Sequence, residues 1–168
     1  MQRGVSVRGE PKHVLVYDLE SPEPFYEAAG YRPDGSRGQG LLGWDGPVQH
    51  TLYEQFFPAE GLYQGIEWGA PVGGLRVARL DILPDREEEV NAWYNDEHMP
   101  LLNRCPGAIG GRRFKAVVAD LAYMSIIGVT DPSVLEGPAW AEVSKTPWTR
   151  RLVPKAFGTR WGARYRVI

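Results

Sequence analysis

The chain has 168 residues, of which 43% are hydrophobic and 24% are charged, and its formal net charge is −2. These values are typical of one soluble globular domain, or of one domain with a smaller added module. The charge gives no indication of nucleic acid or of an anionic membrane surface as a partner. No run of apolar residues is long enough for a membrane span and no signal-peptide pattern occurs, so we expect a cytoplasmic protein.

Residue types that bind metals or form disulfides are sparse in this chain. The one cysteine, Cys105, excludes an internal disulfide and a cysteine metal cage, and we interpret it as a structural thiol. His13, His50 and His98 lie far apart and lack the H-x-x-x-H spacing, so we predict no metal site. Haem would need an axial ligand, and nothing besides His98 favours it, so we predict no cofactor.

The first part of the chain alternates short ordered segments with glycine-rich ones. Residues 1–11 are polar and are expected to be loose. The segments that follow are interpreted as a strand, a short helix, a long loop, a second strand and a glycine-rich connection, over residues 13–19, 23–29, 30–47, 48–57 and 58–74. Trp44, within the long loop, is a candidate plug or lid.

A strand is expected over residues 75–83, and the strongest helix pattern follows it. Asp85 and Glu88 form a D-x-x-E pattern that resembles a capping box. Four side chains then fall on one helical face: Val90, Trp93, Tyr94 and His98. Pro100 lacks an N–H and disfavours helical geometry in the preceding residue. We therefore predict that the helix ends or kinks at His98.

The C-terminal part continues with strands and proline-punctuated helical segments. Strands are predicted over residues 108–118 and 121–129, and the second is expected to be central because both of its faces are apolar. Asp131 and Pro132 open a second helix, which Pro138 and Pro147 break into pieces. A last strand over residues 159–168 alternates cleanly, and the basic residues between 145 and 166 are interpreted as solvated faces.

The element order after residue 74 is therefore β-α-β-β-α-β, which predicts an α+β fold of the ferredoxin-like type. Helices would cover one face of the sheet. The other face would need a second sheet, either from a partner subunit or from residues 1–74. We accordingly divide the chain into a segment of strands and glycine-rich loop over residues 1–74 and a ferredoxin-like module over residues 75–168.

Four short motifs carry a resemblance to a known family. They are W-Y-N-D-E-H-M-P, L-L-N-R-C-P-G, G-R-R-F and T-P-W-T-R-R, which begin at residues 93, 101, 111 and 146. The second part of the chain resembles the dimeric α+β barrel superfamily, and within it the EthD-like branch. The resemblance implies a homodimer in which each subunit supplies one sheet of a barrel. Residues 1–74 would then be a degenerate second module or a lid.

Members of this superfamily include lactone isomerases, polyketide cyclases, cofactor-free monooxygenases, haem enzymes and non-catalytic proteins, so the fold does not name the reaction. The resemblance implies that His98 lines a pocket between sheet and helices.

The polar cluster at the end of the predicted helix holds the candidate catalytic residues. His98 is the side chain best suited to proton transfer near neutral pH. Asn95 would reach the same space and orient a carbonyl group, and Asp96 would orient the imidazole. Tyr94 is a weaker candidate. The alternatives are a structural helix-end histidine, solvent-facing carboxylates and a core tyrosine.

Candidate substrate-binding residues lie on the predicted strands and the long loop. Arg113 would bind a carboxylate or enolate oxygen, beside Tyr123 on a neighbouring strand; an exposed edge position for Arg113 is equally compatible with the sequence. His50 and Tyr53 would face the same cavity if the N-terminal strands cover it, and Trp44 would close it.

The sequence contains no dinucleotide-binding glycine motif, no P-loop and no nucleophile elbow. An apolar pocket with one histidine suits proton abstraction next to a carbonyl. We therefore predict a cofactor-free isomerase, cyclase or dehydratase that acts on a small aromatic, lactone or polyketide-like molecule. A cofactor-free monooxygenase and a non-catalytic ligand-binding or interaction protein are the alternatives.

Overall fold

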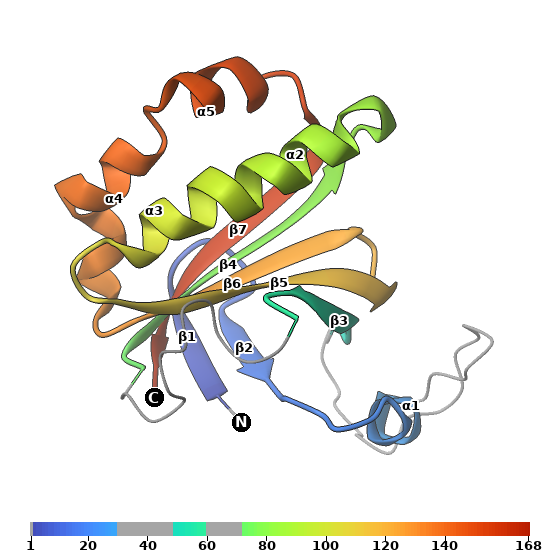
Figure 1. Cartoon of the computed structure of the whole chain (residues 1–168). Helices are drawn as coiled ribbons and strands as arrows, with labels where there is room; N and C mark the ends of the chain where they lie inside the picture. The colour runs from blue at the N-terminus through green and yellow to red at the C-terminus, as the bar shows by residue number, and fades with distance from the viewer. Residues whose placement is uncertain (1, 30–48, 60–71) are drawn as a thin grey trace.

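A computed structural model describes residues 2–29, 49–59 and 72–168. Trp44 and the long loop around it lie outside the described residues. Seven strands in the described part form one antiparallel sheet in the order β2-β1-β7-β4-β6-β5-β3 (Figure 1).

The central strands form the ferredoxin-like module. They are β4 (Gly74–Ile82), β5 (Ala108–Val118), β6 (Tyr123–Val129) and β7 (Phe157–Val167). Numbered within the module, their order β7-β4-β6-β5 is 4-1-3-2, and helices separate the first strand from the second and the third from the fourth. The predicted α+β class and the predicted β-α-β-β-α-β order are confirmed. β6 is central, because its alternate side chains pack into both apolar layers.

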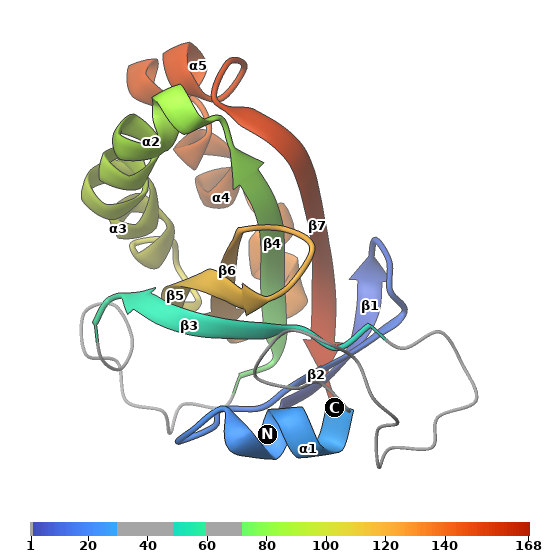
Figure 2. The ribbon, with the colours of Figure 1, turned by 90° about the vertical axis from the view of Figure 1, so that its right-hand side faces the viewer.

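The N-terminal strands extend this sheet at both edges. β1 (Gln2–Arg8) and β2 (His13–Val16) follow β7, and β3 (Leu52–Phe57) pairs with β5 (Figure 2). The expectation that residues 1–11 are loose is wrong for residues 2–8. A segment with so few apolar residues becomes a strand because β7 and β2 supply a backbone hydrogen-bond ladder on either side of it.

Short helices cover one face of the sheet (Figures 1 and 2). They are α2 (Glu87–Trp93), α3 (Met99–Asn103), α4 (Pro138–Val143) and α5 (Pro147–Leu152), while α1 (Glu23–Ala29) lies apart from them. Within residues 2–29, 49–59 and 72–168, every helix is too short or too polar to cross a membrane.

The helix that begins near residue 87 differs from its prediction at both ends. A 3-10 turn, Pro84–Arg86, precedes it, and no side chain caps its first turn, so Asp85 and Glu88 do not form a capping box. At the other end the chain passes through a π turn, Tyr94–His98, and continues as α3. In an α-helix the ring of Pro100 would clash with the carbonyl four residues earlier. The wider π turn avoids this clash, so the helix does not end at His98.

The proline-rich segment after β6 follows the sequence prediction more closely. Asp131 caps a 3-10 turn, Pro132–Glu136, by accepting a hydrogen bond from the Ser133 N–H at 2.9 Å. Pro138 and Pro147 each stand at the start of a short helix, where a missing N–H costs nothing. The predicted division of this segment by prolines is therefore confirmed.

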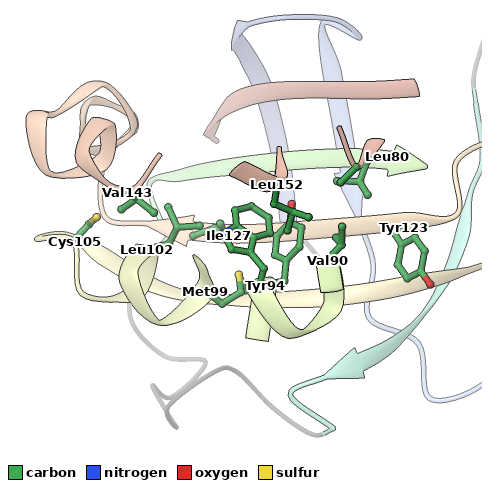
Figure 3. Packing of buried hydrophobic residues seen from close by; sticks show 12 residues of the cluster. Leu80, Val90, Tyr94, Met99, Leu102, Cys105, Tyr123, Ile127, Val143 and Leu152 are labelled. Atoms are coloured by element: carbon green, nitrogen blue, oxygen red, sulfur yellow. The ribbon is translucent and has the colours of Figure 1, made fainter. Parts of the chain in front are cut away.

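Two apolar layers lie on opposite faces of the sheet. The layer under the helices joins α2, α3, α4 and α5 to β4 and β6, and twelve buried residues form it (Figure 3): Leu80, Val90, Trp93, Tyr94, Met99, Leu102, Cys105, Tyr123, Ile127, Val143, Leu152 and Ala156. The second layer includes Leu75, Val77, Phe114, Ile126, Ala163 and Tyr165. Side chains from β2 and β3 pack against it, so residues 1–74 contribute to covering this face.

Candidate functional site

A cavity of about 500 Å³ lies between the helices and the sheet. Alternation along β4 turns Arg76, Ala78 and Leu80 toward the helices, and β6 places Ser125 and Ile127 directly opposite on the same face. The remaining wall comes from α3, from the turn after Asp131 and from α4, including Leu102, Leu135, Trp140 and Val143. The helical side of the cavity thus combines apolar side chains with the polar His98, Glu136 and Ser144, and the sheet side carries arginines and Ser125.

His98 enters this cavity from the π turn. Its ring stacks on Trp93, with centroids 4.3 Å apart and an interplanar angle of 22°, and meets the Tyr94 ring edge-on at 5.3 Å. Residues five apart lie about one turn apart in a π-helix but not in an α-helix, so the π turn is what aligns the two rings. The Trp93 Nε1–H donates to Thr149 Oγ1 at 3.1 Å, which fixes the platform under the imidazole.

The surroundings of the His98 imidazole disfavour its protonated form. Its Nδ1 is buried and has no hydrogen-bond partner among the described residues. Burial, together with the positive charges of Arg76 and Arg113, lowers the pKa of His98 to about 3. The ring is therefore neutral at pH 7 and presents a lone pair, which is the form that accepts a proton.

Three arginines line the sheet side of the same cavity. Arg8, Arg164 and Arg76 occupy directly opposed positions on β1, β7 and β4. Arg76 donates to the backbone carbonyl of Val77, and no ion pair joins Arg76 to an acidic side chain in the described ranges. Burial lowers the pKa of its guanidinium.

The missing side chain at Gly162 also determines the position of Arg76. A Cβ atom added to Gly162 on β7 would lie 2.7 Å from both terminal nitrogens of the guanidinium. The absence of a side chain at residue 162 is what lets the guanidinium lie there.

Arg113 lies beside the cavity, with only 2% of its surface exposed. Its two terminal nitrogens donate to the amide oxygens of Asn95 and Asn91, both at 2.7 Å. The guanidinium also lies over the rings of Tyr94 and Phe56, at 4.2 and 4.7 Å from their centroids. Burial lowers its pKa to about 10.

The other predicted catalytic residues are placed as follows. Tyr94 is buried and lines the cavity with His98. Asn95 is held by Arg113, and Asp96 is exposed on the outer side of the helix. Neither side chain lines the cavity. The neighbouring Glu97 accepts a hydrogen bond from Thr146 Oγ1 at 2.6 Å, so it does not orient the imidazole.

The predicted binding residues do not gather at one place. Tyr123 lies on the helical face, where its hydroxyl donates to Glu87, but it does not line the cavity. Tyr53 packs in the layer on the opposite face, and its hydroxyl donates to the carbonyl of Leu121 at 2.9 Å. His50 precedes β3 and is also absent from the cavity wall.

Sequence reasoning missed Arg76 and Arg164, and the interpretation of the late basic residues as solvated is wrong for Arg164, whose side chain is 20% exposed. The local pattern does not single out Arg76, because each face of the strand over residues 75–83 carries an arginine together with apolar residues. No group of three residues of the types that hold metal ions occurs close together in the described ranges.

Comparisons with known proteins leave the family of this chain open. No family model matches it. No curated protein matches it either. Among solved structures, a candidate monooxygenase from Fusobacterium nucleatum has 8% identity and a TM-score of 0.43 over 61% of this chain and 45% of its own. A candidate monooxygenase from Lactobacillus acidophilus has 11% identity and a TM-score of 0.43 over 56% and 44%. An anthrone oxidase-like protein has 14% identity and a TM-score of 0.42 over 60% and 45%.

This chain spans less than half the length of those three proteins. Similarities at this level carry no argument about activity, so the functional proposal is built from the cavity itself.

Proposed function

We propose that the protein is an acid–base enzyme that needs no cofactor and moves a proton next to a carbonyl group in a small aromatic, lactone or polyketide-like molecule. The observation that carries this proposal is the neutral imidazole of His98, which lines a cavity of mixed polar and apolar character and whose buried Nδ1 has no hydrogen-bond partner among the described residues. A cavity of about 500 Å³ is within the range for a compact organic ligand.

In the proposed reaction His98 removes a proton from the carbon next to a carbonyl, and negative charge develops on the carbonyl oxygen. The Arg76 guanidinium, on the opposite wall, stabilises this charge, and returning the proton to a second carbon completes an isomerisation. Trp93 and Tyr94 hold the imidazole, while Asn95 acts as a positioning residue because it fixes Arg113 under the Tyr94 ring.

A second candidate, ligand binding without catalysis, is favoured by the low pKa of His98. A base whose conjugate acid has a pKa near 3 is a weak proton acceptor at neutral pH. Catalysis therefore requires that the bound ligand raise this pKa, which a partial negative charge near Arg76 would do.

Deuterium exchange tests the proposal without knowledge of the natural substrate. We expect the protein to accelerate exchange of the acidic protons of 2-tetralone, or isomerisation of α-angelica lactone, in D₂O as followed by ¹H NMR. His98→Gln should reduce the rate about 100-fold or more, which is the usual contribution of a general base. His13→Gln, at an exposed histidine on β2, is the matched control and should keep full activity.

Full activity in His98→Gln would refute the role of His98. Binding of either probe with no exchange in the unmodified protein would favour the non-catalytic candidate. Oxygen uptake in the same reaction would favour the monooxygenase instead.

A further inference from the structure

The geometry points to an anion subsite at the sheet side of the cavity, formed by Arg76 and Arg164 with Arg8 at its margin, which binds a carboxylate carried by the ligand. This inference rests on the proposed function in that it concerns the same cavity and names the class of molecule that the cavity accepts. Three kinds of observation support it: strand pairing, charge balance and the shape of the apolar wall.

Strand pairing sets like charges against each other. Arg76 is directly opposite Arg164 in the β4–β7 pair, and Arg164 is directly opposite Arg8 in the β7–β1 pair. Directly opposed like charges on antiparallel strands are destabilising. A row of three arginines across adjacent strands therefore costs stability in the empty protein. An anion between the guanidinium groups would remove that repulsion.

The acidic side chains near this row do not balance it. Among the described residues, Glu136 is the one acidic residue in the cavity wall, and its carboxylate lies 3.5 Å from Arg164 with 65% of the side chain exposed. Within the described ranges Arg76 has no such acidic partner, and it donates a hydrogen bond to the Val77 carbonyl. His98 adds no charge, because it is neutral at pH 7.

The chemistry of these groups favours a carboxylate. A guanidinium presents paired N–H donors that match the two oxygens of a carboxylate, and the resulting hydrogen bonds are stronger than those between neutral groups. Leu102, Leu135, Trp140 and Val143 provide an apolar wall for the remainder of the ligand. The expected ligand is therefore a compact, apolar and largely planar carboxylic acid.

Isothermal titration calorimetry on the whole protein at pH 7 and low ionic strength provides the test, with three probes that share the naphthyl ring: 2-naphthoate, its planar neutral analogue 2-naphthamide, and 2-naphthyl phosphate. We expect 2-naphthoate to bind about tenfold more tightly than 2-naphthamide. One charge-assisted hydrogen bond that replaces a neutral one is enough to change the dissociation constant by this factor. Added salt should reduce this preference. Equal binding of the two would overturn the inference, and tighter binding of the phosphate would overturn the assignment to a carboxylate.

Substitutions then locate the subsite. Arg76→Gln should bring the preference for 2-naphthoate close to one, while Glu136→Gln should strengthen 2-naphthoate binding because it removes a competing carboxylate. Arg160→Gln is the matched control: Arg160 is on the same strand, is exposed and does not line the cavity. It should leave the preference unchanged. An unchanged preference in Arg76→Gln, or an equal loss in Arg160→Gln, would overturn the inference.

Two further variants separate the possible failures. Arg76→Lys keeps the positive charge but loses the paired N–H donors, so it should show an intermediate preference for 2-naphthoate. It replaces Arg76→Gln in this test if that variant does not fold. His98→Gln should retain the full preference for 2-naphthoate, because binding of the carboxylate does not depend on proton transfer. The proposed function can therefore fail in the exchange assay while the subsite is confirmed by calorimetry, and the reverse is equally distinguishable.

Discussion

At the scale of single residues, the site depends on burying charged or titratable groups without acidic partners. The imidazole of His98 has a pKa of about 3 in the folded protein, against about 6.5 for an unperturbed histidine. Between these pH values the unfolded chain binds a proton that the folded chain does not. Stability therefore falls as pH decreases from about 6.5 towards 3, and this loss stops below the folded-state pKa.

This linkage predicts a measurable difference between the protein and His98→Gln. The protein should lose up to roughly 1.4 kcal/mol per pH unit more than the variant across this window. Urea unfolding at several pH values, analysed for the free energy of unfolding, measures the effect. His13→Gln serves as the reference, since this histidine is exposed on β2. Parallel pH profiles for His98→Gln and the protein would contradict the burial of a neutral imidazole.

The sequence predicted His98 and Arg113 but not Arg76 or Arg164, and the reason is physical. His98 continues a helical apolar face whose periodicity can be recognised from a single segment. The direction of Arg76 depends instead on which face of β4 the helices cover. That choice is made by packing between distant segments, so the pattern of one strand cannot decide it.

At the scale of elements, the π turn Tyr94–His98 is the feature that shapes the site. Met99 donates its N–H to the carbonyl of Tyr94, five residues earlier. The sequence pattern predicted a helix and a disturbance near Pro100, but helical periodicity does not distinguish an ended helix from one that widens for a single turn. The continuation into α3 is favoured by the burial of Met99 and Leu102 in the layer under the helices.

Because of the π turn, we expect Pro100→Ala to raise the free energy of unfolding and to lower activity. Alanine restores a backbone N–H and removes the ring, so the helix can relax towards α geometry and should gain about 1–3 kcal/mol in free energy of unfolding. The same change should disturb the stacking of His98 on Trp93 and reduce proton exchange at least several-fold. Denaturation and the exchange assay on the same sample test both effects. Pro154→Ala, at an exposed proline after α5, is the control.

At the scale of the whole molecule, the N-terminal strands turn a four-stranded module into a wider sheet. To predict this wider sheet from sequence, one would have to know that β1 pairs with β7, which lies at the other end of the chain. Neither partner's local pattern contains that information. The predicted division at residue 74 and the predicted homodimer both stay predictions, although β2 and β3 already pack against the far face of the module.

One long-range ion pair joins the N-terminal segment to the central sheet. Asp18 accepts from the buried Arg112 on β5 at 2.6 Å. Removing the carboxylate partner of a buried charge is destabilising, and the exposure of Asp18, 62% of its side chain, moderates the effect. Asp18→Asn should therefore lower the free energy of unfolding by about 1–2 kcal/mol. Glu20→Gln, an exposed charge in the same segment, should change it by much less; equal effects of the two would contradict a specific role of the pair.

Gly162 gives the protein a means of changing ligand choice without changing its charge. Because the guanidinium of Arg76 lies where a side chain at residue 162 would be, even one methyl group there would displace it. Substitutions of different size at this single exposed position would change the position of the Arg76 guanidinium by different amounts and leave His98 and its aromatic platform intact. Within a lineage of such proteins, divergence in substrate length could therefore proceed at a site that touches no substrate.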